Sequence, residues 1–143
     1  MEFLLYLTPA GKSIYNLISQ KVKIVENSPI CRQHKIFGWF DSKKNTMILC
    51  TDNIISTGEP HHYMNETIYH ESVHIAQSCK SSDGYIEPFG ISPSFMTISD
   101  DKKKDIKNAV SISGPQIRNI EHEALWMEDK PEKVKYVLEK YCF

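Results

Sequence analysis

Apolar side chains recur every three or four positions in several parts of the chain, which is typical of helices with one buried face. Thr8 followed by Pro9 resembles a helix start, with an N-cap and then proline in the first turn. The stretch 85–99 predicts an irregular loop, and the charged run 100–105 a solvated turn or helix start. The pattern as a whole predicts four helices: about 9–21, from Met64 to about Cys79, from Gly114-Pro115 to about Glu128, and a last helix with Val134, Val137, Leu138 and Tyr141 on one face.

Shorter apolar runs predict a small sheet. Residues 36–40 and 46–50 flank the polar turn 41–45, which favours an antiparallel β-hairpin. Residues 22–25 predict a further short strand. No repeat or linker divides the chain, so we expect one α+β domain over residues 1–143, with a short antiparallel sheet or hairpin packed on helices.

Composition excludes some classes of protein. The 143 residues are 41% hydrophobic and 24% charged, as in ordinary globular domains. The net charge of -1 creates no strong field toward nucleic acid or an anionic membrane, so we expect neither as a partner. The apolar run 3–7 is far shorter than the roughly 20 residues of a transmembrane helix, and no basic residue precedes it as in a signal peptide. We therefore expect a cytoplasmic protein.

The four cysteines are Cys31, Cys50, Cys79 and Cys142, and no two of them have the C-x-x-C spacing of zinc ribbons or thioredoxin-type sites. Without a secretory segment, we expect them to be reduced and mostly buried. The alternative is a Cys31–Cys50 bridge, if the protein is exported by another route.

The segment His70-Glu71-Ser72-Val73-His74 carries the clearest chemistry. Histidines at positions i and i+4 of a helix lie on the same face, so both imidazoles can reach one metal ion. Glu71 is displaced around the helix, where it can act on a metal-bound water without binding the ion itself. H-E-x-x-H on a helix is the pattern of zinc metallopeptidases, and chance would give about 0.02 matches in this composition.

A third ligand is expected from the helix that follows Gly114-Pro115. On a helical wheel Glu121 falls within the apolar face, where an unpaired carboxylate is costly, so a metal would explain its position. Glu123 falls on the polar face, where solvent explains it. We predict Glu121 as the ligand; the alternatives are that Glu123 takes this place, or that Glu121 only pairs with Arg118.

H-E-x-x-H followed by Glu121-His122-Glu123-Ala124 resembles the gluzincin branch of the zincin superfamily of metallopeptidases, in which E-x-x-A supplies the third ligand. His74-Ile75-Ala76-Gln77 is similar to the H-x-x-Q extension of some small zincins. The resemblance implies a small zincin-like domain with Zn²⁺ held by His70, His74 and Glu121, and a sheet whose edge strand borders the cleft. In that family the residue four positions after the third-ligand glutamate is often Asp or Asn, whereas this chain has Leu125 there.

The expected function is therefore that of a small zinc-dependent peptidase acting on a peptide or protein, with Glu71 as general base and then general acid. The alternative is a non-catalytic zincin-like binding or interaction module with a structural zinc site. A third reading is hydrolysis of a non-peptide amide. The oxyanion also needs a donor, and the sequence leaves five candidates open: Tyr63, Tyr85, His61, His62 and Arg118.

Overall fold

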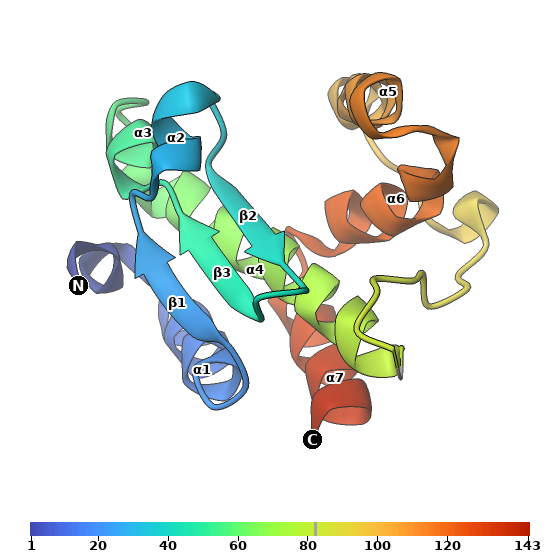
Figure 1. Cartoon of the computed structure of the whole chain (residues 1–143), viewed down its shortest axis with the longest axis horizontal. Helices are drawn as coiled ribbons and strands as arrows, with labels where there is room; N and C mark the ends of the chain where they lie inside the picture. The colour runs from blue at the N-terminus through green and yellow to red at the C-terminus, as the bar shows by residue number, and fades with distance from the viewer. Residues whose placement is uncertain (82) are drawn as a thin grey trace.

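The computed structural model describes residues 1–81 and 83–143, and its elements are shown in Figure 1. Seven α-helices and one three-stranded sheet make up most of the described chain, which is an α+β domain as expected. The α-helices are α1 (Pro9–Ile18), α2 (Pro29–Gln33), α3 (Thr51–Ile55), α4 (Pro60–Lys80), α5 (Asp100–Ser113), α6 (Arg118–Met127) and α7 (Pro131–Cys142). The strands are β1 (Lys23–Glu26), β2 (Gly38–Asp41) and β3 (Thr46–Leu49), and short 3₁₀ turns lie at Glu2–Tyr6, Pro93–Phe95 and Pro115–Ile117.

The sheet has the strand order β1-β3-β2, which makes β2 an edge strand. β2 and β3 form the predicted antiparallel hairpin, with Trp39 opposite Ile48. β1 pairs with β3 in parallel, so the expectation of a wholly antiparallel sheet is wrong. The chain reverses twice between β1 and β3, once through α2 and once in the hairpin turn. β3 therefore runs in the same direction as β1.

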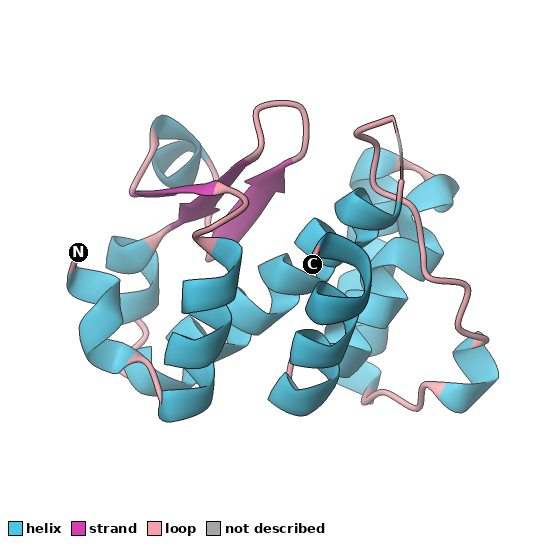
Figure 2. Cartoon of the chain, turned by 90° about the horizontal axis from the view of Figure 1, so that it is seen from below, coloured by secondary structure: helices cyan, strands magenta, loops and turns pink. Residues whose placement is uncertain are grey.

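Helix α4 is the centre of the domain. The sheet covers one side of it, and α1 and α7 pack on it away from the sheet (Figures 1 and 2). α4 begins at Pro60, several residues before the predicted start, because proline is favoured in the first turn of a helix. The core between these elements consists of fully buried apolar side chains, among them Ile14, Ile18, Met47, Leu49, Ile68, Val73 and Leu138.

The start of α1 is attached to α4 by polar contacts. The Thr8 side chain caps α1 as predicted, accepting a hydrogen bond from Gly11 N at 3.0 Å. Buried Asn65 accepts from Thr8 N and donates to the Tyr6 carbonyl. A Cβ at Gly11 would collide with the Asn65 amide, so this close approach requires glycine.

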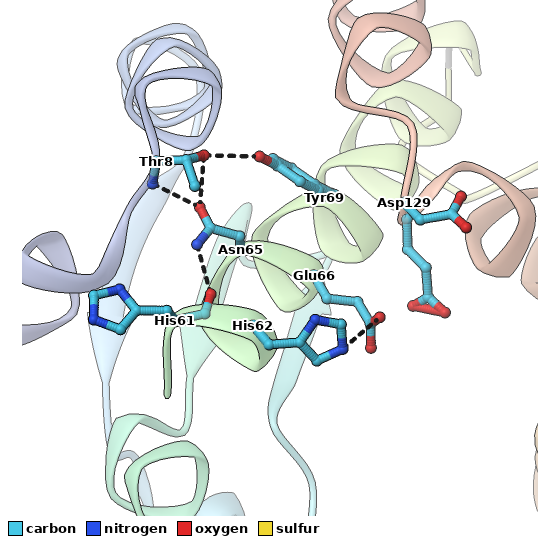
Figure 3. A pocket seen from close by; sticks show the side chains of 8 residues that line it. Thr8, His61, His62, Asn65, Glu66, Tyr69 and Asp129 are labelled. Carbon is cyan, nitrogen blue, oxygen red and sulfur yellow. Dashed lines mark hydrogen bonds and ion pairs between the residues drawn. The ribbon is translucent and has the colours of Figure 1, made fainter. Parts of the chain in front are cut away.

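A cavity of about 350 Å³ lies beside these contacts, at the N-terminal end of α4 (Figure 3). His61, His62, Glu66 and Tyr69 line it from α4, and Asp129 lines it from the turn before α7. His62 Nε2 lies 3.5 Å from Glu66 Oε2. This part of α4 therefore presents polar side chains to an open hollow.

The segment 83–117 joins α4 to α6 and has little contact with the sheet. It is an irregular loop over 85–99, as predicted, followed by α5, which the Ser99 side chain caps. The charged run 100–105 is thus the start of a helix. A small separate cluster of Ile98, Ile106 and Leu125 packs α5 against α6.

All four cysteines form disulfide bonds, so the expectation of reduced thiols is wrong. The bonds are Cys31–Cys50, the alternative that the sequence left open, and Cys79–Cys142. The second bond joins the end of α4 to the end of α7. A pairing over 63 residues depends on tertiary structure and has no local signal in the sequence. No described helix combines the length and apolar character needed to span a bilayer.

We predict that the Cys79–Cys142 bond stabilises the domain more than the Cys31–Cys50 bond. In the chain-entropy model a bond that closes the longer loop removes more freedom from the unfolded chain, about 4 kcal/mol against about 3 kcal/mol. Cys79→Ala/Cys142→Ala should therefore lower the free energy of unfolding in urea more than the matched pair Cys31→Ala/Cys50→Ala. The reverse order, or no change in either variant, would contradict this assignment.

Candidate metal centre

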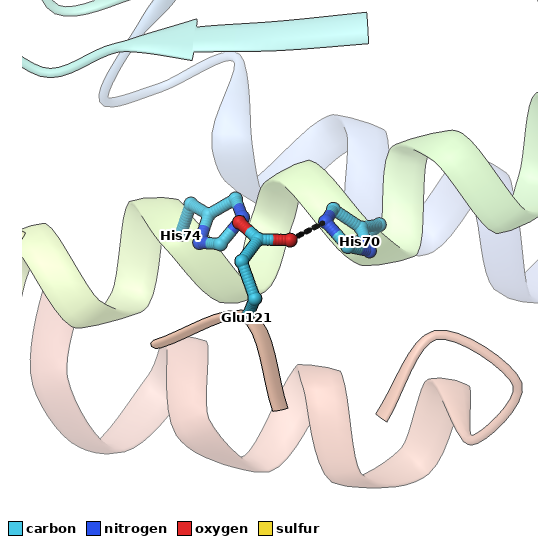
Figure 4. Close-up of side chains that lie close together, drawn as sticks. All are labelled: His70, His74 and Glu121. Carbon is cyan, nitrogen blue, oxygen red and sulfur yellow. Dashed lines mark ion pairs between the residues drawn. The ribbon is translucent and has the colours of Figure 1, made fainter. Parts of the chain in front are cut away.

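The structure brings His70, His74 and Glu121 together. The two histidines lie one turn apart on α4, and Glu121 reaches them from α6 (Figure 4). Glu121 Oε2 lies 3.4 Å from His70 Nε2, and Glu121 Oε1 lies 2.9 Å from His74 Nε2. The carboxylate thus bridges the two imidazoles, one oxygen to each. Its ion pairs are with these histidines and not with Arg118, the alternative partner.

These three residues could hold a metal ion. One ligand atom from each lies within 4.8 Å of the others. Two ligands about 2.0–2.1 Å from a tetrahedral Zn²⁺ lie about 3.3 Å apart, close to the two carboxylate–imidazole separations of 3.4 Å and 2.9 Å. The donor set, two imidazole nitrogens and one carboxylate oxygen, also suits zinc and other first-row divalent ions. The site stays reachable, because 24% of the Glu121 side chain and 17% of the His70 side chain are exposed.

The charges in this group depend strongly on one another when no metal is bound. Burial acts to lower the pKa of His70, but its hydrogen bonds to Glu121 and Glu128 outweigh burial and hold that pKa well above the usual value. Burial likewise acts to lower the pKa of His74, and the Glu121 charge raises it above the usual value. For Glu121, burial is outweighed by the histidines, above all His74, and its pKa is strongly lowered. Without a metal, protons therefore occupy the imidazole nitrogens that would bind the ion.

Glu71 is buried beside the group, with 8% of its surface exposed. Burial raises its pKa, and the charges of His74 and His70 partly oppose this. Edge strand β2 lies close over it: a Cβ added at Gly38 would meet Thr67 Cγ2 at 2.6 Å and Glu71 Cγ at 3.2 Å. Gly38 thus allows the strand to approach the helix at the position of the predicted general base.

Glu128 contacts the second nitrogen of the His70 ring, Nδ1. Its Oε2 lies 3.3 Å from His70 Nδ1, and its Oε1 lies 3.4 Å from Lys102 Nζ of α5. Lys102 also donates to the Leu125 carbonyl at 2.8 Å. The sequence analysis missed Glu128, although it follows Glu121 by seven residues and so lies two turns along the same helix face. Leu125, where the resemblance to gluzincins implies Asp or Asn, packs instead in the apolar cluster with α5.

Gln77 forms a hydrogen bond with His74, the second histidine. Its Oε1 lies 2.8 Å from His74 Nδ1, so the glutamine of the H-x-x-Q segment contacts the predicted ligand directly. Such partners fix the ring orientation of metal-binding histidines.

Glu123 does not belong to the group formed by His70, His74 and Glu121, and the expectation that solvent surrounds it is wrong. Its side chain is fully buried and accepts hydrogen bonds from Gln77 and from the backbone of residues 89–91. A helical wheel misplaced it because the wheel assumes one buried face. α6 is covered on two faces, by α4 and by the 85–99 loop.

The five candidate oxyanion donors make no hydrogen bond or ion pair with the three predicted ligands in the described residues. The ring centroids of Tyr63 and Phe37 lie 5.2 Å apart, and Tyr85 is 64% exposed. Arg118, His61 and His62 are exposed. The structure therefore does not select among them.

Because metal and protons compete for the same nitrogens, divalent ion binding should release protons. The raised pKa values of His70 and His74 mean that both rings must lose a proton before they bind the ion. We predict that zinc affinity increases with pH through and above the ordinary histidine range. Calorimetry in two buffers of different ionisation enthalpy should show net proton release at pH 7. An affinity that stays constant between pH 6 and pH 8 would contradict this prediction.

Comparison with known proteins gives a family but no activity. No curated protein and no solved structure matches the chain. One family model matches residues 3–143 and is described as a domain of unknown function, DUF8637. Since this match spans almost the whole chain, the protein belongs to the DUF8637 family.

Proposed function

We propose that this chain is a small zinc-dependent metallopeptidase of the gluzincin type. The observation that supports the proposal is the convergence of His70, His74 and Glu121, with Glu71 buried next to them. A predicted helix motif and a carboxylate far away in the sequence meet at distances that suit one ion. The proposed substrate is a peptide or protein.

In this proposal each residue has a separate task. Bound Zn²⁺ would lower the pKa of water toward about 7 and polarise the substrate carbonyl. His70, His74 and Glu121 would hold the ion. Glu71 accepts a proton from the attacking water and returns it to the leaving amine. Its raised pKa brings this carboxylate closer to the range in which it can exchange protons at neutral pH.

The alternative is a non-catalytic module with a structural zinc site. Structural sites are almost always closed by four protein ligands, whereas catalytic sites have three and an open position. The group found among the described residues has three members. Burying the Glu71 carboxylate also costs free energy that the neighbouring histidine charges only partly offset, and a structural site has no use for it. Both observations favour the enzyme.

The environment of the protein is part of the proposal. The sequence led us to expect a cytoplasmic location, and the two disulfides argue against a reducing compartment. We therefore propose that the enzyme acts where disulfides persist.

The variant Glu71→Gln separates catalysis from metal binding. It keeps the shape of the side chain but cannot accept a proton, so peptide cleavage should fall by about 10²–10⁴-fold while zinc content stays near one ion per chain. The assay is digestion of an unbiased peptide library followed by mass spectrometry. Glu59→Gln, at an exposed glutamate before the same helix, is the matched control and should keep full activity. Undiminished cleavage by Glu71→Gln would exclude the proposed base, and zinc binding without any cleavage by the wild type would favour the structural module.

Zinc should stabilise the folded protein through the same three residues. At a free concentration of about 100 times its Kd, the ion contributes about 2.7 kcal/mol, which corresponds to a Tm increase of roughly 8–10 °C for a domain of this size. Glu121→Gln should abolish most of this increase, whereas Glu132→Gln, at an exposed glutamate of α7, should retain it. An equal increase in both variants would mean that zinc binds elsewhere.

A further inference from the structure

Glu123 is a fully buried carboxylate that forms no ion pair with any described lysine, arginine or histidine. Its hydrogen bonds come from one side-chain amide and three consecutive backbone amides. Oε1 accepts from Gln77 Nε2 at 2.9 Å and from Phe89 N at 2.8 Å, and Oε2 accepts from Gly90 N at 3.1 Å and Ile91 N at 3.2 Å. Removing a carboxylate from water is costly, and hydrogen bonds to its charged form offset that cost. A purely apolar contact between α6 and the loop would avoid this cost, so packing alone does not explain a carboxylate at this position.

The Gln77 amide has only one orientation that satisfies its neighbours. Its Nε2 donates to Glu123 and also to the Ile120 carbonyl at 3.1 Å. A carboxylate and a carbonyl accept hydrogen bonds and cannot donate them, so the NH₂ group must face these two. Oε1 is thereby directed to His74 Nδ1.

The orientation of Gln77 in turn determines the tautomer of His74. An amide oxygen can only accept, so Nδ1 of the neutral imidazole must carry the proton. When the ring gives up its second proton, as metal binding requires, the lone pair is therefore on Nε2, which faces Glu121. This is the tautomer that a metal ligand needs, and Glu123 is the side chain that, together with the Ile120 carbonyl, enforces it through Gln77.

We propose that Glu123 is a positioning residue for the metal centre: through Gln77 it sets the His74 tautomer, and through Phe89, Gly90 and Ile91 it links metal binding to docking of the 85–99 loop. This inference rests on the proposed metal site. Linkage between two sites is reciprocal. Zinc should therefore protect the amides of residues 89–91 from hydrogen exchange, and changes that release this segment should weaken zinc binding.

The test is a double-mutant cycle on Gln77 and Glu123 in the full disulfide-bonded chain, with zinc affinity measured by competition with a chelator. Glu123→Gln places an amide NH₂ against backbone N–H donors, and Gln77→Glu places two carboxylates face to face. Each single variant should weaken zinc binding by roughly 10–100-fold, the usual effect of disturbing the partner of a metal-binding histidine. In Gln77→Glu/Glu123→Gln the acceptor toward His74 and the donor–acceptor pair between the two positions are both restored. The double variant should therefore bind zinc more tightly than the single variant with the lower affinity, and equal or lower affinity would contradict the coupling.

Two further readouts separate positioning from general destabilisation. The imidazole ¹⁵N spectrum of the zinc-bound wild type should show a protonated Nδ1 at His74, and this signal should shift or broaden in each single variant. Hydrogen exchange should show zinc-dependent protection at residues 89–91 in the wild type and its loss in Gln77→Glu. Since Gln77→Glu leaves all three backbone N–H donors to Glu123 in place, it tests the link even if Glu123→Gln fails to fold.

Each outcome decides the question. Wild-type zinc affinity in both single variants, losses that add in the double variant, or an unchanged His74 signal would overturn the role of Glu123 while leaving the peptidase proposal standing. A wild-type protein that binds no zinc would overturn both. Weakened binding in the single variants with recovery in the double variant would support the positioning role.

Discussion

The Glu121 carboxylate, placed between His70 and His74, is the interaction on which the rest of the site depends. It is the point at which α6 meets the centre of α4, and each of its oxygens contacts a different imidazole. A carboxylate in a largely buried position needs positive charge nearby. Protonated imidazoles supply that charge in the free protein, and in our proposal a divalent ion supplies it in the active form.

Two polar chains lead away from this carboxylate and attach it to the rest of the fold. One runs from His70 through Glu128 to Lys102 of α5. The other runs from His74 through Gln77 to Glu123 and the loop. The segment between α4 and α6 packs on the main core through Ile86, Phe89 and Ile91 and on α6 through a small apolar cluster, and the two polar chains connect it to the histidines. The same contacts therefore orient the metal-binding histidines and fix the position of that segment.

The parts of the site that follow from local geometry could be predicted from the sequence. Histidines four residues apart share a helix face wherever the helix lies, and Glu121 was identified because a carboxylate in an apolar face needs a partner. Contacts that depend on how distant segments meet could not be predicted in this way. The parallel pairing of β1 with β3 and the Cys79–Cys142 bond join residues far apart in sequence. Glu123 and Glu128 were misplaced or missed because their surroundings come from the 85–99 loop and from α5, which no helical wheel includes.

The most direct test of the central claim is anomalous diffraction at the zinc absorption edge from crystals of the protein grown with zinc. The account predicts a single strong peak bonded to Nε2 of His70, Nε2 of His74 and the carboxylate of Glu121, at about 2.0–2.2 Å from each. Crystals that show no peak at this position, with Glu121 still paired directly to both imidazoles, would contradict the account.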